Sequence, residues 1–386
     1  MSERGNNSSA ESMLPNELLE LCKSDSLSED GLREIIERHA LTHHDHRVND
    51  YKFFVLACKN ERVTEGMIRY LLEYFPAAAS ATYNDGWATR NRQCSGHLGY
   101  LPLHSICGNK SVTLNIVQLL IKAAPDSVRQ KEKFGLMPVH KICDNRDVDE
   151  TTAIEILKLL IEKYPEAVQH IGGIGNHLPI HLASIQRSPE FCRVLIEASP
   201  ESERMTAANG MLPLHFACMV NTVATVEYLY QLYPDAINHA SRSRDRAYPI
   251  DAAMQGLNGR NNPTDAMEIM DFLLGCDPNV VDGLSLLHFA CQREHNSNIE
   301  ARMRMQVINV IYDSRPEEIE DNAIASNIHE YHQRIQAFIN TQLVHARQAK
   351  DRRLMTTPDG NGQLPLHTAL QSNIRLGSIK LLVKGN

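Results

Sequence analysis

The chain has 386 residues, of which 42% are hydrophobic and 22% are charged, a composition typical of a folded protein rather than a disordered one. Its formal net charge of −8 excludes the basic balance of a general nucleic-acid binder but leaves room for local basic patches. No apolar run approaches the roughly 18 residues of a membrane-spanning helix, and MSERGNNSSAESM lacks the apolar core of a secretory signal.

The nine cysteines are expected to be reduced thiols. Their number is odd, they are spread along the chain, and no C-x-x-C pair occurs. In a chain without a secretory signal, this usage is typical of a reducing compartment. We therefore expect a protein of the cytoplasm or the nucleus.

The first 50 residues divide into two parts. Residues 1–13 are rich in Ser, Asn and Glu and are predicted to be disordered. Residues 14–50 contain two amphipathic patterns, PNELLELC and SEDGLREIIERH. They are predicted to form an N-terminal helical cap.

A histidine-rich tract, HALTHHDHRVND, ends this cap and contains His39, His43, His44, Asp45 and His46. Such tracts can bind metal ions. Because no second ligand cluster occurs elsewhere, a solvated loop is the favoured interpretation. Removal of metal is expected to leave the melting temperature unchanged.

A short motif recurs along the rest of the chain, and NGMLPLHFAC at residues 209–218 is its clearest copy. LGYLPLHSIC, FGLMPVHKIC and IGNHLPIHLAS precede it, while DRAYPIDAA, VDGLSLLHFAC and GNGQLPLHTAL follow it. The marker position is usually His and once Asp251, and it recurs every 34 to 41 residues before a last gap of 79. The repeated Pro and His positions are Pro102, His104, Pro138, His140, Pro179, His181, Pro213, His215, His288, Pro365 and His367.

A second pattern follows each copy: an amphipathic run that ends at a Pro. VQLLIKAAPDSV, LKLLIEKYPEAV and VEYLYQLYPDAI are examples. Each unit is therefore predicted to contain a turn, a short helix, a loop, a longer helix and a Pro-marked exit. DYKFFVLACKNERVTEGMIRYLLEYFP is a degenerate first unit, with Val55 at the marker position. The exit prolines are Pro76, Pro125, Pro165, Pro200 and Pro234, with Pro278 and Pro316 as looser matches.

This arrangement resembles the ankyrin repeat, whose signature is Thr-Pro-Leu-His-x-Ala at a spacing of about 33 residues. The resemblance covers about residues 51–386. It implies an all-α solenoid of about eight helix-turn-helix units, of which most lie in residues 51–326. It also implies that the marker histidine hydrogen-bonds the backbone of adjacent turns, and that the protein recognises another protein without chemistry of its own.

The sequence departs from the ankyrin signature at the Thr position, where only Ser285 keeps a hydroxyl that could cap its helix. The apolar side chains at the other units are expected to pack against the next turn instead. The residues that replace the Thr are Leu101, Met137, Leu178, Leu212, Tyr248 and Leu364. The preceding turns contain glycines, for which a positive φ costs little; they are Gly135, Gly175, Gly210, Gly283 and Gly362.

The C-terminal part interrupts the repeats. Residues 327–353, which begin NIHEYHQRIQAFINTQ, are predicted to form one inserted amphipathic helix whose basic end could dock a partner. Residues 354–386 are predicted to form a final ankyrin-like repeat that is incompletely capped.

The marker histidines raise the question of chemistry, because His104, His140, His215 and His288 each precede a Cys by three residues. Zinc requires four converging ligands, and this spacing supplies at most two in each unit. A structural histidine is therefore favoured. No dinucleotide-binding, P-loop, G-x-S-x-G or H-E-x-x-H motif occurs, so we expect no enzyme, no metal and no cofactor.

Two loops outside the motif are the candidate contact sites. The loop SATYNDGWATRNRQCSGHLGY contains Trp87, Arg90 and Arg92, and HASRSRDRAYP contains Arg242, Arg244 and Arg246. A lone Trp beside arginines is a reasonable contact hot spot, and arginines grip acidic or phosphorylated groups. For the arginine loop, a solvated loop is the favoured alternative.

The predicted function is that of a scaffold or adaptor, which binds an unidentified protein partner through repeat tips and concave inner helices. One alternative is a nucleic-acid-associated regulator that uses the basic residues at 242–246 and 345–353, although no general nucleic-acid binding is expected. A metal- or thiol-dependent enzyme is a less favoured alternative. No membrane association is expected.

Overall fold

The computed structural model describes residues 13–40, 51–83, 99–132, 134–242, 247–255 and 263–277. The predicted inserted helix at 327–353 and the predicted final repeat at 354–386 lie outside these residues. The chain divides into two compact units, Met1–Ala253 and Met254–Asn386.

The described residues form an all-α structure: they contain no strand, only isolated bridges between Tyr83 and Tyr100 and between Gly172 and His177. The helices alternate along the first unit. The first helix of each pair is α1 (Met13–Lys23), α3 (Lys52–Lys59), α5 (Pro102–Cys107), α7 (Pro138–Asp144), α9 (Pro179–Gln186) or α11 (Pro213–Val220). The second is α2 (Glu29–Arg38), α4 (Glu65–Tyr74), α6 (Leu114–Ala123), α8 (Glu150–Lys163), α10 (Pro189–Ala198) or α12 (Val223–Leu232). Helix α13 (Pro249–Gln255) begins within this unit.

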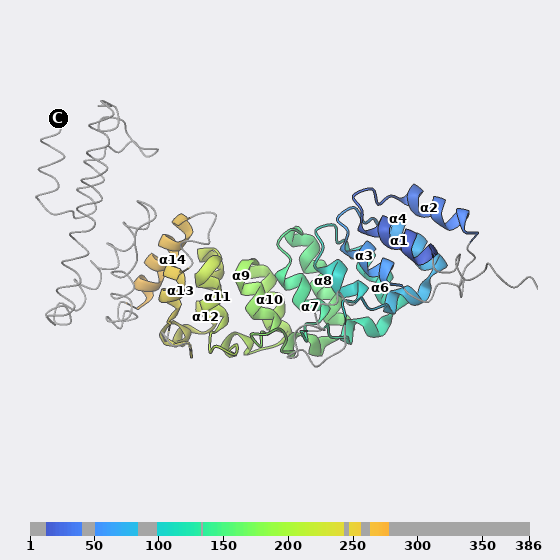
Figure 1. The fold of residues 1–386 in the computed structure, drawn as a ribbon. Helices are drawn as coiled ribbons and strands as arrows, with labels where there is room; N and C mark the ends of the chain where they lie inside the picture. Colours follow the sequence, from blue (N-terminus) through green and yellow to red (C-terminus); the bar gives the residue numbers. More distant parts are fainter. Residues whose placement is uncertain are drawn as a thin grey trace, which may run out of the picture. The chain divides into compact units, whose positions relative to one another are not determined.

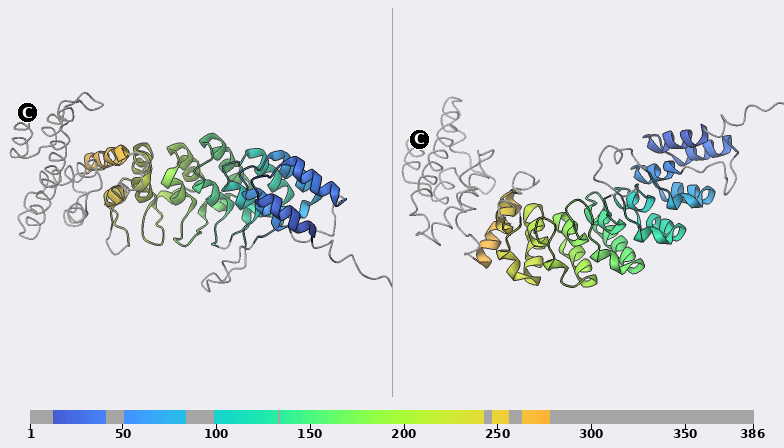
Figure 2. Two further views of the ribbon diagram at one scale, coloured as in Figure 1. Left: turned by 45° about the horizontal axis from the view of Figure 1, so that its top comes forward. Right: turned by 60° about the horizontal axis from the view of Figure 1, so that its bottom comes forward.

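These helices pack in two rows. Each first helix contacts the first helix of the next pair, from α1 to α11, and each second helix contacts the next second helix, from α2 to α12. Within every pair the two helices also contact each other. Figures 1 and 2 show the pairs following one another in chain order. Each helix therefore packs both against its own row and against the other helix of its pair. Neither row could bury its apolar side chains alone.

The two rows begin their helices differently. Four first helices, α5, α7, α9 and α11, have Pro at their first position after an extended, buried Leu or Met that supplies no capping hydrogen bond. Proline suits this position because its missing N–H would have no intrahelical partner. The second helices α4, α6, α8 and α10 instead have polar caps, whose side-chain oxygens accept backbone N–H groups. These caps are Thr64, Thr113, Asp149 and Ser188.

The prolines that follow the second helices do more than end them. Pro76, Pro125, Pro165 and Pro234 each begin a short 3-10 helix, namely η1 (Pro76–Ser80), η3 (Pro125–Arg129), η4 (Pro165–Gln169) and η6 (Pro234–Asn238). Pro200 is the exception, since η5 (Ser202–Arg204) begins after Glu201 adopts a left-handed conformation with φ of 70°. The sequence predicts the exit but not the 3-10 turn.

A continuous hydrophobic core extends through the pairs. One cluster of buried residues contains side chains from Leu18 in α1 to Leu195 in α10. The N-terminal helices α1 and α2 therefore share the core of the later pairs. Cys58, Cys107 and Cys143 are fully buried in the first helices, where their small side chains permit close helix approach.

A ladder of asparagines connects the pairs at the ends of the first helices. The Nδ2 atom of Asn109 donates to the carbonyls of Cys58 and Asn60 at 2.9 Å each, and Asn145 donates in the same way to Cys107 and Asn109. Each asparagine thus bonds the backbone of the previous unit and offers its own carbonyl to the next. These buried carbonyls would otherwise lack donors at the helix ends.

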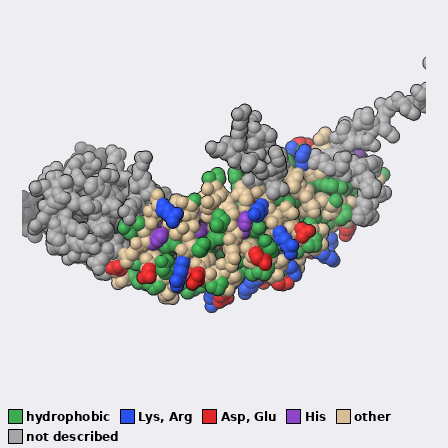
Figure 3. Space-filling model, turned by 90° about the horizontal axis from the view of Figure 1, so that it is seen from below, with side chains coloured by type: hydrophobic (Ala, Val, Ile, Leu, Met, Phe, Trp, Pro, Cys, Tyr) green, Lys and Arg blue, Asp and Glu red, His purple; other side chains and the backbone are tan. Residues whose placement is uncertain are grey.

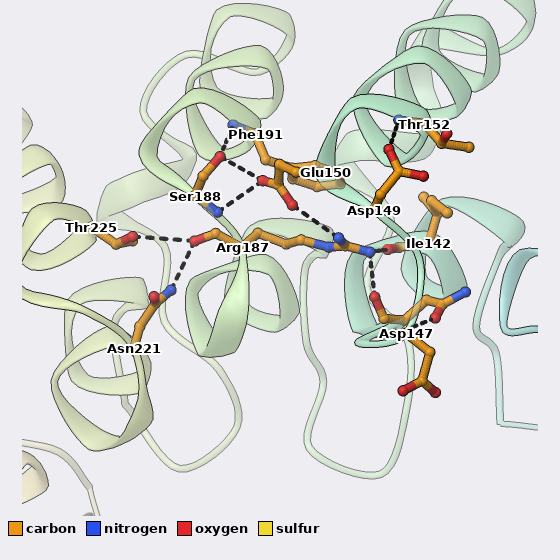
Figure 4. Close-up of polar contacts among 11 residues, drawn as sticks. Ile142, Asp147, Asp149, Glu150, Thr152, Arg187, Ser188, Phe191, Asn221 and Thr225 are labelled. Atoms are coloured by element: carbon orange, nitrogen blue, oxygen red, sulfur yellow. Dashed lines mark hydrogen bonds and ion pairs between the residues drawn. The ribbon is translucent and has the colours of Figure 1, made fainter. Parts of the chain in front are cut away.

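Arg187 replaces asparagine at the end of α9, the next first helix after Asn145 in this ladder (Figure 4). Its Nη2 donates to the carbonyls of Ile142 and Asn145, and its Nη1 pairs with Glu150 at 3.0 Å. Its own carbonyl accepts from Asn221 at 2.9 Å, which resumes the ladder. Arg187 is almost fully buried, so its charge is neutralised by Glu150 and solvated by backbone dipoles.

In the second unit, the structure describes helix α14 (Pro263–Cys276), whose buried residues Ala266, Ile269, Met270 and Leu273 recur at helical spacing. No helix within the described ranges has both the length and the apolarity to cross a membrane.

Candidate partner-binding surface

The loops that connect one pair to the next form a series of tips. We define the tip segments as residues 130–136, 170–177, 205–211 and 239–242, each of which follows a 3-10 helix; Lys133 in the first of them lies outside the described residues. Their positions are set by the marker histidines. His140 accepts the N–H of Met137 at its Nδ1 and donates from Nε2 to the carbonyl of His170 at 3.0 Å.

The same two bonds recur in the next two units. His181 bonds Leu178 and Met205, and His215 bonds Leu212 and His239. Each histidine therefore ties the start of its first helix to the loop that follows its second helix. His104 donates to the carbonyl of Leu136 at 3.1 Å, while its Nδ1 has no hydrogen-bond partner among the described residues.

These histidines are fully buried, and burial sets their charge. Desolvation lowers the pKa of His140, His181 and His215 to about 4 and that of His104 to about 3. They are neutral at pH 7, as required of a ring that accepts at one nitrogen and donates at the other.

Single backbone hydrogen bonds also join neighbouring tips. The N–H of Gly173 donates to Phe134 at 2.8 Å, that of Ala208 to Gly175 at 2.9 Å, and that of Arg242 to Asn209 at 2.7 Å. The four tips therefore form one connected surface rather than independent loops.

Glycine is required at particular points of this surface. Gly135 and Gly210 have φ of 76°, as the sequence predicts for residues in these turns. The expectation for Gly175 was wrong, because the positive φ values in that tip belong to Gly173 and Asn176. The segment 170–177 has eight residues where its neighbours 130–136 and 205–211 have seven, so its turn has a different register.

The tips expose aliphatic side chains. Ile174 is 89% exposed, and Ile171 and Met205 are each 50% exposed. All three lie on the adjacent tips 170–177 and 205–211. Figure 3, viewed from the side on which the loops of Figure 1 lie, shows hydrophobic side chains among histidine, basic and acidic ones. Aliphatic side chains gathered on one exposed face favour a contact surface.

The first helices contribute a second surface beside the tips. The residue after each marker histidine is partly exposed in three consecutive units, as Lys141, Leu182 and Phe216. The ring of His177 lies edge-on to Phe216, with centroids 5.5 Å apart. This row therefore changes from charged at α7 to apolar at α9 and α11.

The structure describes only one of the predicted contact residues, Arg242, which is exposed at the fourth tip. The others, Trp87, Arg90, Arg92, Arg244 and Arg246, lie outside the described residues, as do His288, Pro365 and His367 of the repeated motif. His39 of the histidine-rich tract bonds Glu17 at 3.1 Å, and His43, His44 and His46 lie outside the described residues.

The base of the loop that contains Trp87 is described. Tyr83 and Tyr100 exchange two backbone hydrogen bonds of 2.8 Å. The ammonium of Lys59 lies 3.4 Å from the ring centroid of Tyr100 and 5.4 Å from that of Tyr83, so cation–π contacts hold both ends of the loop to α3.

The described cysteines are free thiols, and all of them but Cys276 are buried. Desolvation raises the pKa of Cys107 and Cys192 to about 12 and that of Cys58 further. These thiols are protonated at neutral pH, unlike a catalytic thiolate. Across the part of the chain that the structure describes, no three His, Cys, Asp or Glu side chains are grouped so as to hold a metal ion.

Sequence reasoning missed the exposed tip residues Ile171, Ile174 and Met205 and the asparagine ladder. The ladder has a readable signal: Asn60, Asn109 and Asn145 each follow a repeated Cys by two residues. The tip residues have a weaker one, since an Ile between two glycines in GGIGNH is an apolar residue where a turn is expected. Arg187 lies six residues after its marker histidine, as Asn221 does, but its residue type gives no signal of the same role.

Comparison of the sequence with models of known protein families and with curated proteins finds no match.

Proposed function

We propose that the chain is an ankyrin-like repeat solenoid that binds another protein through its tip segments and the inner face of its first helices. Three features support the proposal: helix pairs that recur with the sequence motif, marker histidines that tie each tip to its pair, and rows of like helices in contact. Such an array presents an extended surface, which suits a scaffold or adaptor.

One observation supports the proposed binding surface most directly. Four large hydrophobic side chains among the described residues are exposed, and three of them, Ile171, Ile174 and Met205, lie on two neighbouring tips. Scattered apolar residues need no explanation, but a group on one face favours an interaction site. The fourth, Leu232, ends helix α12 and offers a matched control.

We propose that the function is non-catalytic and intracellular. The buried, protonated thiols argue against thiol chemistry, because a nucleophilic cysteine needs an accessible thiolate. Free cysteines throughout the described core fit a reducing compartment such as the cytoplasm or the nucleus.

The proposal is tested by affinity capture from cell extract with three forms of the full chain: wild type, Ile174→Asp and Leu232→Asp. We expect a partner that is retained by wild type and Leu232→Asp and lost with Ile174→Asp, while circular dichroism shows equal helicity. Equal retention by all three forms would contradict the tip surface. Failure of the wild type to retain any protein would contradict the binding function itself.

A further inference from the structure

The tip surface has cationic ends. Lys131 on the first tip and Arg242 on the fourth are both exposed, and neither forms an ion pair with any residue that the structure describes. The one carboxylate in the described tip segments, Glu132, is buried and pairs with Lys141 at 2.7 Å. The exposed formal charges of the described tip residues are therefore all positive, although the whole chain carries −8.

The centre of the surface has no formally charged side chain and exposes aliphatic ones. The two middle tips, 170–177 and 205–211, contain no Lys, Arg, Asp or Glu, and they expose Ile171, Ile174 and Met205. The ends are attached to this centre: Lys131 lies near His170, whose pKa is lowered by burial and further by that ammonium. The backbone of Arg242 bonds Asn209 of the third tip.

We infer that this surface binds an extended segment of a partner protein, in which a short apolar centre is flanked on both sides by Asp or Glu. The inference rests on the proposed function and adds the chemistry of the partner. Packed helices lie roughly 8–10 Å apart, so four tips span about 25–30 Å. An extended segment covers that length with about eight or nine residues.

The charge pattern favours a protein segment over a nucleic acid. A polynucleotide carries a phosphate at every nucleotide, and its binding requires a row of cations or stacking aromatic rings. The middle tips offer aliphatic side chains instead, which gain free energy by burial against apolar groups. Carboxylates at the ends of an apolar segment match the two separated cations.

The test uses immobilised peptide libraries of about nine residues and the full chain. One library places Asp or Glu on both sides of an aliphatic or aromatic centre. The second has Lys or Arg in the acidic positions, and the third has Ser or Asn. We expect retention by the acidic library alone, with affinity that falls as salt is raised. Preferential retention by either of the other libraries, or by none, would overturn the inference.

Variants test whether the retained acidic peptide binds at the tips. The double change Lys131→Glu with Arg242→Glu is expected to weaken binding at least about tenfold. The matched control is Lys122→Glu with Lys158→Glu, which reverses two exposed charges on α6 and α8 and is expected to change affinity less than about twofold. Equal losses in the two double variants would overturn the inference, as would a single-stranded RNA oligomer that displaces the peptide from the wild type.

Failure of this inference can be distinguished from failure of the proposed function. A captured partner that depends on Ile174 but whose contact segment is neutral or basic would overturn the inference and leave the binding function standing. A chain that captures no partner contradicts the proposed function, whichever library it retains.

Discussion

Single buried polar side chains set the geometry of each unit. His140, His181 and His215 each satisfy two backbone groups, and Asn109 and Asn145 each satisfy two carbonyls of the preceding unit. A buried carbonyl without a donor costs about 1–3 kcal/mol. Removal of one such side chain is therefore expected to lower the free energy of unfolding by more than the hydrogen bonds it makes, because the backbone groups it leaves behind stay buried without a partner.

Arg187 provides the sharpest test of the ladder. Arg187→Met should lower the free energy of unfolding by about 3 kcal/mol, because the carbonyls of Ile142 and Asn145 lose a donor and the carboxylate of Glu150 loses its ion pair. Arg187→Asn should recover at least about 1 kcal/mol, since Asn221 fills the same role one unit later. Urea unfolding measures the stability of both variants. Equal losses of stability in the two would show that the hydrogen bonds of Arg187 do not contribute to it.

Asp251 stands where most of the other units have histidine, and its Oδ2 accepts the N–H of Tyr248 at 2.8 Å. Burial raises its pKa to about 6. Because the folded pKa is above the unfolded value, its stabilising contribution is present below pH 4 and is lost as pH rises through 6.

Asp251→Asn keeps an acceptor and removes the buried charge. We expect it to stabilise the chain by about 2 kcal/mol at pH 8 and to have little effect near pH 4. Thermal unfolding at the two pH values measures the difference, and a gain of the same size at both would refute the assignment to charge.

At the scale of the helices, the sequence predicts the order of elements well and their termini less well. The periodic apolar residues and exit prolines predict both helices of each unit, because one face of each must be buried. The 3-10 helices after Pro76 and Pro125 and the shifted turn around Gly173 depend on packing between units, which a single copy of the motif does not encode.

The candidate site is less predictable than the helices. The tips that expose Ile174 and Met205 differ from copy to copy, so comparison of repeats gives no pattern for them. Of the predicted contact residues, the structure describes Arg242 alone. The exposure of a tip side chain depends on how the tip lies against its neighbours. That arrangement is set by backbone hydrogen bonds between tips, which the sequence does not reveal.

Gly210 tests the contact between tips. Its φ is 76°, and a Cβ there would lie 2.6 Å from the backbone nitrogen of Arg242. Gly210→Ala should therefore destabilise the chain by about 2 kcal/mol. Gly108→Ala is the control, because its φ is −94° and the nearest atoms would lie 3.7 Å away. The two melting temperatures should differ, and similar values would contradict a strained tip.

At the scale of the whole first unit, stability depends on four neutral histidines. The pKa of each is lowered by burial, to about 4 in three cases and about 3 in His104. A lowered pKa means that the stabilisation is present above pH 6.5 and is lost as pH falls toward the folded values.

Protonation of each histidine should lower the free energy of unfolding by about 3 kcal/mol as the pH falls across that range. The chain should thus unfold cooperatively in acid between pH 6 and pH 4, as followed by circular dichroism. His140→Gln, which cannot titrate, should reduce the proton uptake on unfolding at pH 5 by about one proton. An unchanged dependence of stability on pH in this variant would show that His140 is not the titrating group.

The central claim is that the tips are the binding surface, and hydrogen–deuterium exchange with a captured partner tests it most directly. Amide exchange in residues 130–136, 170–177, 205–211 and 239–242 should slow when the partner is bound, while exchange in helices α8, α10 and α12 stays unchanged. Slower exchange in those second helices, with the tips unaffected, would contradict the account.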